Sequence, residues 1–138
     1  MKHIEDLAPE IRNLYDHYNH TFIQDARGGL ALMQNLCHNQ ALNAGWHDTP
    51  RDKGTMFMLM VSEIAEAMEG ARKELMDDHL EWRKMEEVEL ADTIIRILDY
   101  AGKHNMDLAG AVIEKLCYNA QRADHKREAR AAEGGKKF

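Results

Sequence analysis

The sequence contains few of the residues that cross-link or stiffen small folds. It has two cysteines and two prolines among 138 residues, and no CxxC pair. Cys37 and Cys117 lie far apart, so we expect reduced thiols in place of a disulfide framework. No segment alternates apolar and polar residues with the two-residue period of a strand. Because the prolines are few and the turns are short, the sequence predicts an all-α fold.

Long apolar runs and excess positive charge are also missing. The apolar run at 56–61 is far too short to span a bilayer. The first ten residues contain no apolar segment typical of a secretory signal. The formal net charge of −6 argues against binding to a nucleic acid polymer. We therefore expect a cytoplasmic protein that binds neither membrane nor nucleic acid polymer.

Helical periodicity predicts a single all-α domain over residues 1–138, an antiparallel bundle of four to five helices. Residues 1–29 form an N-terminal extension helix that breaks at 21–29, where Gly28 and Gly29 lie. Residues 128–138 are expected to be a mobile tail. The expected helices cover about 4–20, 30–44, 54–73, 80–104 and 108–127. The buried face of the 80–104 helix is expected to contain Leu90, Ile94, Ile97 and Leu98.

Two pairs of acids, each three residues apart, carry the strongest chemical signal: Glu63 with Glu66, and Glu89 with Asp92. At about 100° per residue, Glu63 lies in the middle of an apolar stripe. A buried carboxylate without a partner is costly. If the two helices pack antiparallel, the four carboxylates converge on a metal site between them. Ligands that are all oxygen suit Mg²⁺ or Mn²⁺ better than zinc.

Other readings of these acids stay open. Most acidic pairs three residues apart lie on solvated helix faces. The cluster could also hold a structural cation in a non-catalytic helical interaction module. A di-iron protein of the ferritin type is disfavoured, because such sites need Glu-x-x-His and none of the eight histidines has a glutamate three residues before it.

Three separated blocks occur in order between residues 36 and 122: GWHDTPRDKGTMFMLMVSEIAEAMEGARK, EVELADTIIRILDYAG and EKLCYNAQR. Together they resemble the MazG-like branch of the all-α nucleoside triphosphate pyrophosphohydrolases, in its short single-domain phage and bacterial form. The signature of that family is E-x-x-E followed by E-x-x-D. The resemblance implies hydrolysis of (deoxy)nucleoside triphosphates between the α and β phosphates, giving a monophosphate and pyrophosphate, in nucleotide-pool control.

The resemblance also assigns the metal and the catalytic residues. Glu63, Glu66, Glu89 and Asp92 would be catalytic and would bind Mg²⁺ or Mn²⁺. Some members have a further glutamate directly before the first motif residue, proposed to activate water, but Ser62 stands there in this chain. Water activation would then depend on a motif carboxylate or on metal-bound hydroxide. A more selective role, such as removal of dGTP for a phage, is an alternative.

A basic stripe is a candidate for holding the triphosphate. Lys115, Asn119 and Arg122 fall at i, i+4 and i+7 and therefore share a helix face. They also match the pattern of the family at this place. The other reading is a solvated basic face.

Six further residues are candidates for nucleotide contacts. Trp46 lies near the base in the resemblance, or it fills the core. His38 contacts the base or is a satisfied core histidine. Lys53 and Arg51 are candidate phosphate contacts. On the 80–104 helix, Arg96 either orders the carboxylates or is a surface charge, and Tyr100 either touches the sugar or phosphate or packs in the core.

The helices are apolar on more than one side, which in so short a chain leaves surface to bury between subunits. Relatives in the resembled family are dimers or dimers of dimers. The expected partners are therefore a nucleoside triphosphate substrate and further copies of this chain, as a homodimer or homotetramer.

Overall fold

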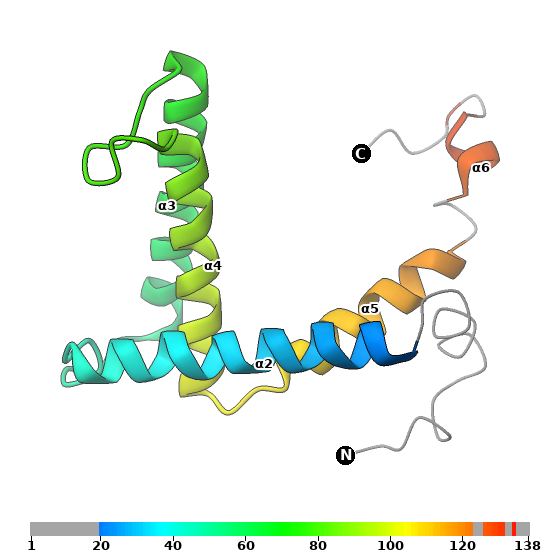
Figure 1. The fold of residues 1–138 in the computed structure, drawn as a ribbon, viewed down its shortest axis with the longest axis horizontal. Coiled ribbons are helices and arrows are strands. Elements are labelled where there is room, and N and C mark those ends of the chain that lie inside the picture. The colour runs from blue at the N-terminus through cyan, green and yellow to red at the C-terminus, as the bar shows by residue number, and fades with distance from the viewer. Residues whose placement is uncertain (1–19, 123–125, 132–133, 135–138) are drawn as a thin grey trace. The chain divides into compact units, whose positions relative to one another are not determined.

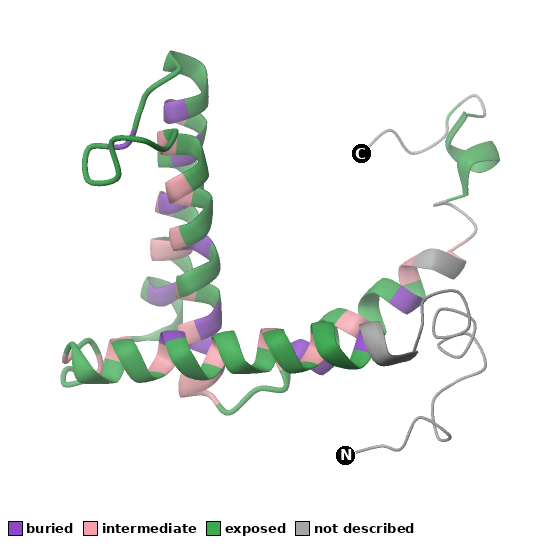
Figure 2. Ribbon diagram, in the orientation of Figure 1, coloured by how far each residue is buried: buried purple, intermediate pink, exposed green. Residues whose placement is uncertain are grey.

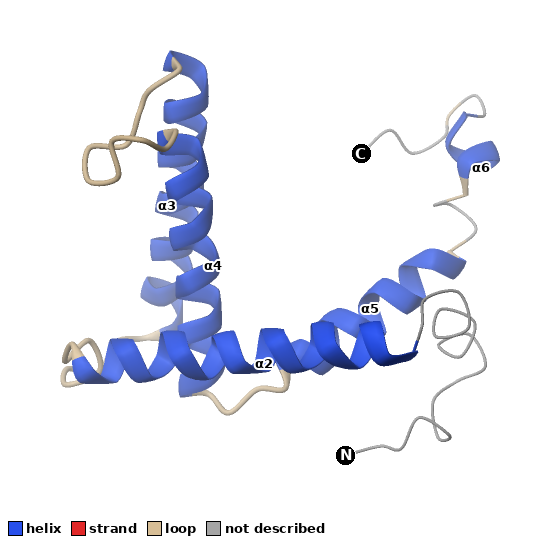
Figure 3. Ribbon diagram, in the orientation of Figure 1, coloured by secondary structure: helices blue, strands red, loops and turns tan. Residues whose placement is uncertain are grey.

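A computed structural model describes residues 20–122, 126–131 and 134 of the chain. Helices dominate this part of the protein (Figures 1 and 3). Its only extended pairing is an isolated antiparallel bridge between Met76 and Lys84. The all-α fold class expected from the sequence is confirmed. The helices are α2 (His20–Asn43), α3 (Lys53–Lys73), α4 (Met85–Lys103), α5 (Leu108–Gln121) and α6 (Arg127–Ala131).

The chain divides into two compact units, which we describe separately. One unit comprises Leu32–Met106 and therefore contains α3, α4 and the second half of α2. The other contains the described residues on either side of it, including α5, α6 and the first half of α2. All four residues of the two acidic pairs belong to the first unit, whereas the basic stripe belongs to the second.

The paired helices α3 and α4 lie side by side and antiparallel, joined by the loop at 74–84 (Figure 1). Asp52 caps α3, and its side chain accepts a hydrogen bond from the Thr55 amide at 3.0 Å. Gly70 lets the two helices approach closely, because a Cβ there would lie 2.9 Å from the backbone nitrogen of Glu86. The antiparallel pairing that the carboxylate site requires is therefore present.

Helix α2 ends in the way that Gly45 predicts. The amide of Trp46 donates to the carbonyl of Ala41, and the amide of Gly45 donates to that of Leu42, each at 3.0 Å. Gly45 has a φ of 75°. These are the two bonds of a Schellman motif with glycine at C′. They turn the chain sharply and fix the loop that carries Trp46 and His47.

The expected break at 21–29 is wrong, because α2 runs through Gly28 and Gly29 without interruption. The two glycines cost about 2 kcal/mol relative to alanine in a helix interior. Tertiary contacts in the turns before the two glycines offset this cost, since Ile23 is buried and Arg27 pairs with Asp107 at 2.7 Å. The helix expected over 4–20 lies outside the described residues, apart from His20.

Two other helix boundaries also differ from expectation. Helix α4 begins at Met85 and not near residue 80, because Asp77 organises a turn: its carboxylate accepts from the amides of His79 and Leu80 at 3.0 and 2.5 Å. Helix α5 has Asp107 as its N-cap, as expected, but ends at Gln121. Part of the expected tail is helical, as α6.

Much of the described chain is exposed (Figure 2), and many of its large apolar side chains are among the exposed residues. Of the four α4 residues expected to be buried, only Leu98 is buried, with 2% of its surface exposed. Ile94 is 55% exposed and Leu90 47%. On α3, Met58 is 62% exposed. The expected burial is thus wrong for this chain taken alone, and exposed apolar residues follow α2, α3 and α4.

None of the described helices combines the length and the apolar character that crossing a membrane requires.

Candidate metal centre

Three of the four motif acids converge between α3 and α4. One carboxylate oxygen each from Glu63, Glu89 and Asp92 can be chosen so that all lie within 4.8 Å of one another. Glu63 is buried, with 6% of its surface exposed, while the other two are half-buried. The i, i+3 spacing and the antiparallel pairing together produce this cluster. Three hard oxygen donors at such distances could hold one divalent cation.

Arg96 is the cation that accompanies the cluster. Its Nε and Nη2 atoms both lie 2.7 Å from Oε1 of Glu63. The sequence left open whether Arg96 orders the carboxylates or is a surface charge, and the structure shows the ion pair. One oxygen of Glu63 remains for another partner. Arg96 thus fixes the orientation of the most buried carboxylate in the cluster.

The remaining carboxyls repel one another. Burial, a hydrogen bond with Glu63 and the nearby charges of Glu66, Glu63 and Asp92 raise the pKa of Glu89 to about 7. Burial and the charge of Glu63 raise the pKa of Asp92, while Arg96 acts in the opposite direction. Burial is the larger cause of both shifts and the neighbouring carboxylates add to it, so the ionised forms are disfavoured even beside Arg96. A divalent cation would favour the ionised forms.

The cluster opens into a cavity of about 740 Å³. Glu66 lines this cavity beside the other three acids, although it is exposed and does not belong to the closest group. The opposite wall is the 75–80 loop. Asp77 in that loop is buried and adds to the negative field on Asp92. The cavity is large enough for part of a small polyanionic ligand.

Nearby acids outside the motif face elsewhere and have their own partners. Glu69 forms ion pairs with Arg72 and Lys73 on the surface of α3. Glu87 pairs with Arg83 at 3.3 Å. Neither lines the cavity. The helical positions thus separate the clustered glutamates from the solvated ones, as the sequence predicts.

Ser62 is not available as a substitute for a water-activating carboxylate. Its hydroxyl donates to the carbonyl of Leu59 within the same helix, at 2.8 Å.

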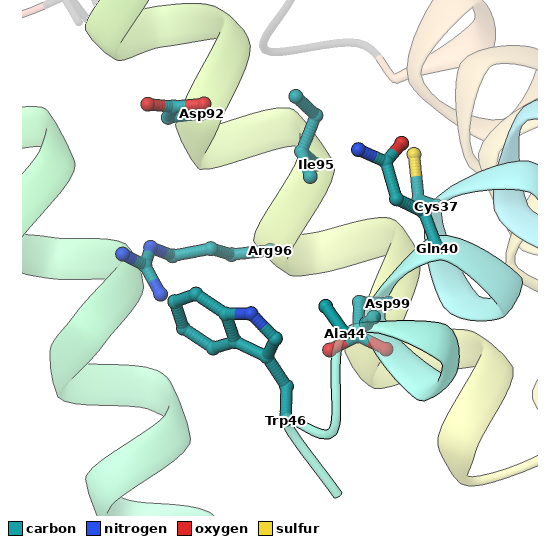
Figure 4. Close-up of a pocket in the computed structure, with 9 residues that line it drawn as sticks. Cys37, Gln40, Ala44, Trp46, Asp92, Ile95, Arg96 and Asp99 are labelled. Carbon is teal, nitrogen blue, oxygen red and sulfur yellow. The ribbon is translucent and has the colours of Figure 1, made fainter.

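A second cavity, of about 280 Å³, adjoins the cluster and is drawn in Figure 4. Arg96 extends from α4 across this space, and the indole of Trp46 lies beside it, with the guanidinium carbon 5.7 Å from the ring centroid. Asp92 lines both cavities. Trp46 is 48% exposed, so it does not simply fill the core. Its ring offers a flat apolar wall next to the carboxylates.

Other candidate nucleotide contacts have structural partners. Arg51 donates to the Trp46 carbonyl at 2.7 Å and lies over its ring, so it holds the loop. Tyr100 is buried against Phe57 and His104, so of the two readings of this residue the structure shows packing in the core. His38 pairs with Asp99. Lys53 is exposed at the first position of α3.

The basic stripe belongs to the second compact unit. Lys115 is exposed and lies over the ring of Tyr118 at 4.7 Å. Asn119 is half-buried near the end of α5. Arg122 is the C-cap residue, with φ −60° and ψ 125°, and therefore no longer continues the helical face.

Sequence reasoning missed the cluster in which Asp99 contacts both His38 and His47. One oxygen of Asp99 lies 2.9 Å from Nδ1 of His38 and 2.8 Å from Nε2 of His47. A signal for Asp99 exists, because it follows Asp92 by seven residues and so lies on the same face of α4. His47 lies in a loop, where periodicity gives no information.

Comparison of this chain with known protein families, curated proteins and solved structures found no match.

Proposed function

We propose that this chain is a metal-dependent nucleoside triphosphate pyrophosphohydrolase of the MazG-like type. The observation that supports the proposal most is the convergence of Glu63, Glu89 and Asp92 within 4.8 Å across α3 and α4. The family signature requires these residues to meet, although they come from separate blocks of the sequence. The reaction would convert a (deoxy)nucleoside triphosphate and water into a monophosphate and pyrophosphate.

The donor set fits Mg²⁺ or Mn²⁺. All donors are carboxylate oxygens, and Glu66 at the cavity edge could complete the set or bind a second ion. Burial and the neighbouring carboxylates raise the pKa values of Glu89 and Asp92, and a bound cation would favour their ionised forms. When bound, the cation would neutralise phosphate oxygens and lower the pKa of the attacking water.

The groups around the cavity have complementary tasks in this proposal. A water oxygen attacks the α-phosphorus, the bond from that phosphorus to the α–β bridging oxygen breaks, and pyrophosphate leaves. The proton of the water goes to a carboxylate of the cluster, since the Ser62 hydroxyl is bonded to its own helix. Arg96 keeps Glu63 oriented, and Trp46 offers a stacking surface for the base. Lys115, Asn119 and Arg122 do not line this cavity, and only the resemblance implies that they contact the outer phosphates.

The exposed apolar surface supports a homodimer or homotetramer. Large apolar side chains of α2, α3 and α4 are about half exposed or more, among them Leu32 at 70% and Met58 at 62%. Contiguous surface of this kind marks interaction sites. We expect light scattering at micromolar concentration to give two or four chains per particle. A stable monomer would contradict this expectation.

The test is hydrolysis of the eight common (d)NTPs, one at a time, with Mn²⁺ and with Mg²⁺. We expect pyrophosphate and the monophosphate in equal amounts, and loss of product in excess EDTA. Comparison of turnover rates would show whether one nucleotide, such as dGTP, is selected. Full activity in EDTA, or release of single phosphates, would overturn the proposed reaction. No product from any nucleotide would favour a helical interaction module with a structural cation.

A further inference from the structure

His38, His47 and Asp99 form a second compact group of potential ligands. The group brings together three elements of one compact unit: the C-terminal half of α2, the loop after it and the C-terminal half of α4. The side chains are 21%, 11% and 16% exposed, so all three are largely shielded from water. Nδ1 of His38, Nε2 of His47 and one Asp99 oxygen lie within 4.8 Å of one another.

We propose that these three residues form a binding site for a divalent transition metal ion, with zinc as the preferred occupant. The proposal does not depend on the hydrolase activity. Two imidazole nitrogens and one carboxylate oxygen are a donor set that zinc and similar borderline ions prefer. Mg²⁺, which binds oxygen donors, is not expected here.

The distances suit a common metal ion. Metal–ligand bonds of about 2.1 Å give ligand–ligand edges of about 3.0 Å in octahedral and about 3.4 Å in tetrahedral geometry. The two edges from the Asp99 oxygen are already 2.9 and 2.8 Å. Small rotations of the side chains would therefore admit an ion at the centre of the group. The ion would replace the protons that the imidazoles share with the carboxylate.

The site is separate from the carboxylate cluster. Asp99 and Asp92 are seven residues apart on α4, which corresponds to roughly 10 Å along the helix axis. Paired catalytic metal ions are about 3.5–4 Å apart. The ion would therefore act mainly as a clamp that joins α2, the loop bearing Trp46 and α4. Asp99 also lines the cavity in Figure 4, which gives water or a small ligand access to the ion.

The surroundings fit the clamp. Gly102 on α4 leaves room for His38, since a Cβ there would lie 2.5 Å from the Cβ of His38. The rings of His38 and His47 are 5.2 Å apart and tilted by 55°, so both can point at one centre.

The experiment is a zinc titration of the full chain without nucleotide. It is done in excess Mg²⁺, which is added to saturate the all-oxygen carboxylate cluster. His38→Asn and His47→Gln each place an amide nitrogen where the imidazole nitrogen was, so the hydrogen bond to Asp99 can persist while the metal ligand is lost. His79→Gln is the control for zinc bound at the surface, because this histidine is 88% exposed and belongs to a separate group with Asp77 and Asp78.

We expect the unmodified chain and His79→Gln to bind one zinc ion per chain with about micromolar affinity. His38→Asn and His47→Gln should bind at least about tenfold more weakly. Equal affinity in all four proteins, or no stoichiometric zinc in the unmodified chain, would overturn the proposal. If either variant fails to fold, electron paramagnetic resonance of Cu²⁺ bound to the unmodified chain decides. A spectrum that shows two nitrogen donors to Cu²⁺ supports the site, and a spectrum without nitrogen donors overturns it.

Because no nucleotide is present, a failure of this site is distinguishable from a failure of the proposed hydrolase. Absence of zinc binding leaves the carboxylate cluster and its Mg²⁺ or Mn²⁺ chemistry unaffected. Absence of hydrolysis leaves the zinc titration unaffected.

Discussion

Two polar clusters lie on α4, and they are built in different ways. The carboxylate cluster is made by three acids on two helices with one cation, Arg96, while Glu66 lies at the edge of its cavity. The cluster around Asp99 has a single carboxylate and two imidazoles, and draws on a loop as well as two helices. The first places several carboxyl groups beside one guanidinium, which favours a cation with hard oxygen ligands. In the second, Asp99 is bonded to both imidazoles while Nδ1 of His47 is buried without a hydrogen-bond partner, and a softer ion would displace the shared protons.

The largest expected effect comes from removing charge within the first cluster. Glu→Gln keeps the size of the side chain and nearly keeps its helix propensity, but it removes the charge that a divalent ion needs. We expect Glu63→Gln and Glu89→Gln to lose activity by about 100-fold or more while remaining folded. Pyrophosphate release with Mn²⁺ and the circular dichroism spectrum measure the two quantities.

The same helices supply the controls. Glu69 and Glu87 are solvated and paired with neighbouring cations. Glu69→Gln and Glu87→Gln should therefore remain close to the unmodified chain in activity. Equal losses in all four variants, or no loss in any of them, would falsify the carboxylate site.

Two glycines allow the two clusters to be damaged separately. A Cβ on Gly102 would meet the Cβ of His38 at 2.5 Å, and one on Gly70 would meet the Glu86 nitrogen at 2.9 Å. Overpacking of this kind costs about 1–3 kcal/mol. Gly102→Ala should weaken zinc binding and spare hydrolysis, whereas Gly70→Ala should impair hydrolysis and spare zinc binding. Thermal denaturation, a zinc titration and the pyrophosphate assay give the three readouts.

Gly28→Ala is the control for helix propensity alone. Nothing lies within 4 Å of a Cβ at that position in α2. The substitution should stabilise the chain by about 1 kcal/mol. If Gly102→Ala stabilises the chain to the same extent as Gly28→Ala, the close approach of His38 to Gly102 is not required for stability.

The contrast between the clusters also explains what the sequence could predict. Acids at i and i+3 identify a site that lies within helices, and Gly45 and Asp107 mark true helix ends. His47 is placed by a helix terminus and a loop, which no periodic pattern encodes. The break expected at Gly28 failed because propensity is weak compared with tertiary contacts. Of the residues expected on the buried face of α4, only Leu98 is buried, because periodicity identifies an apolar helix face but not what covers it.

The smallest expected effect is a pH dependence confined to the carboxylate cluster. The pKa of Glu89 is raised from 4.5 to about 7, so between these values the folded chain holds a proton that the unfolded chain releases. The free energy of unfolding of the metal-free chain should therefore contain a contribution that is present at low pH and is lost as pH rises through this window.

Glu89→Gln removes this contribution, so the difference in melting temperature between that variant and the unmodified chain should change between pH 4.5 and 7. Glu87→Gln should show no such change, because Glu87 is an exposed surface acid paired with Arg83. If Mn²⁺ binds to the carboxylate cluster, it competes with the proton on Glu89 and should raise the melting temperature of the unmodified chain more at pH 7.5 than at pH 5. A Mn²⁺ effect that is equal at both pH values, or that persists in Glu89→Gln, would show that the ion binds elsewhere. The cluster of His38, His47 and Asp99 would then be the first alternative site. Loss of the Mn²⁺ effect in His47→Gln would assign the ion to that cluster.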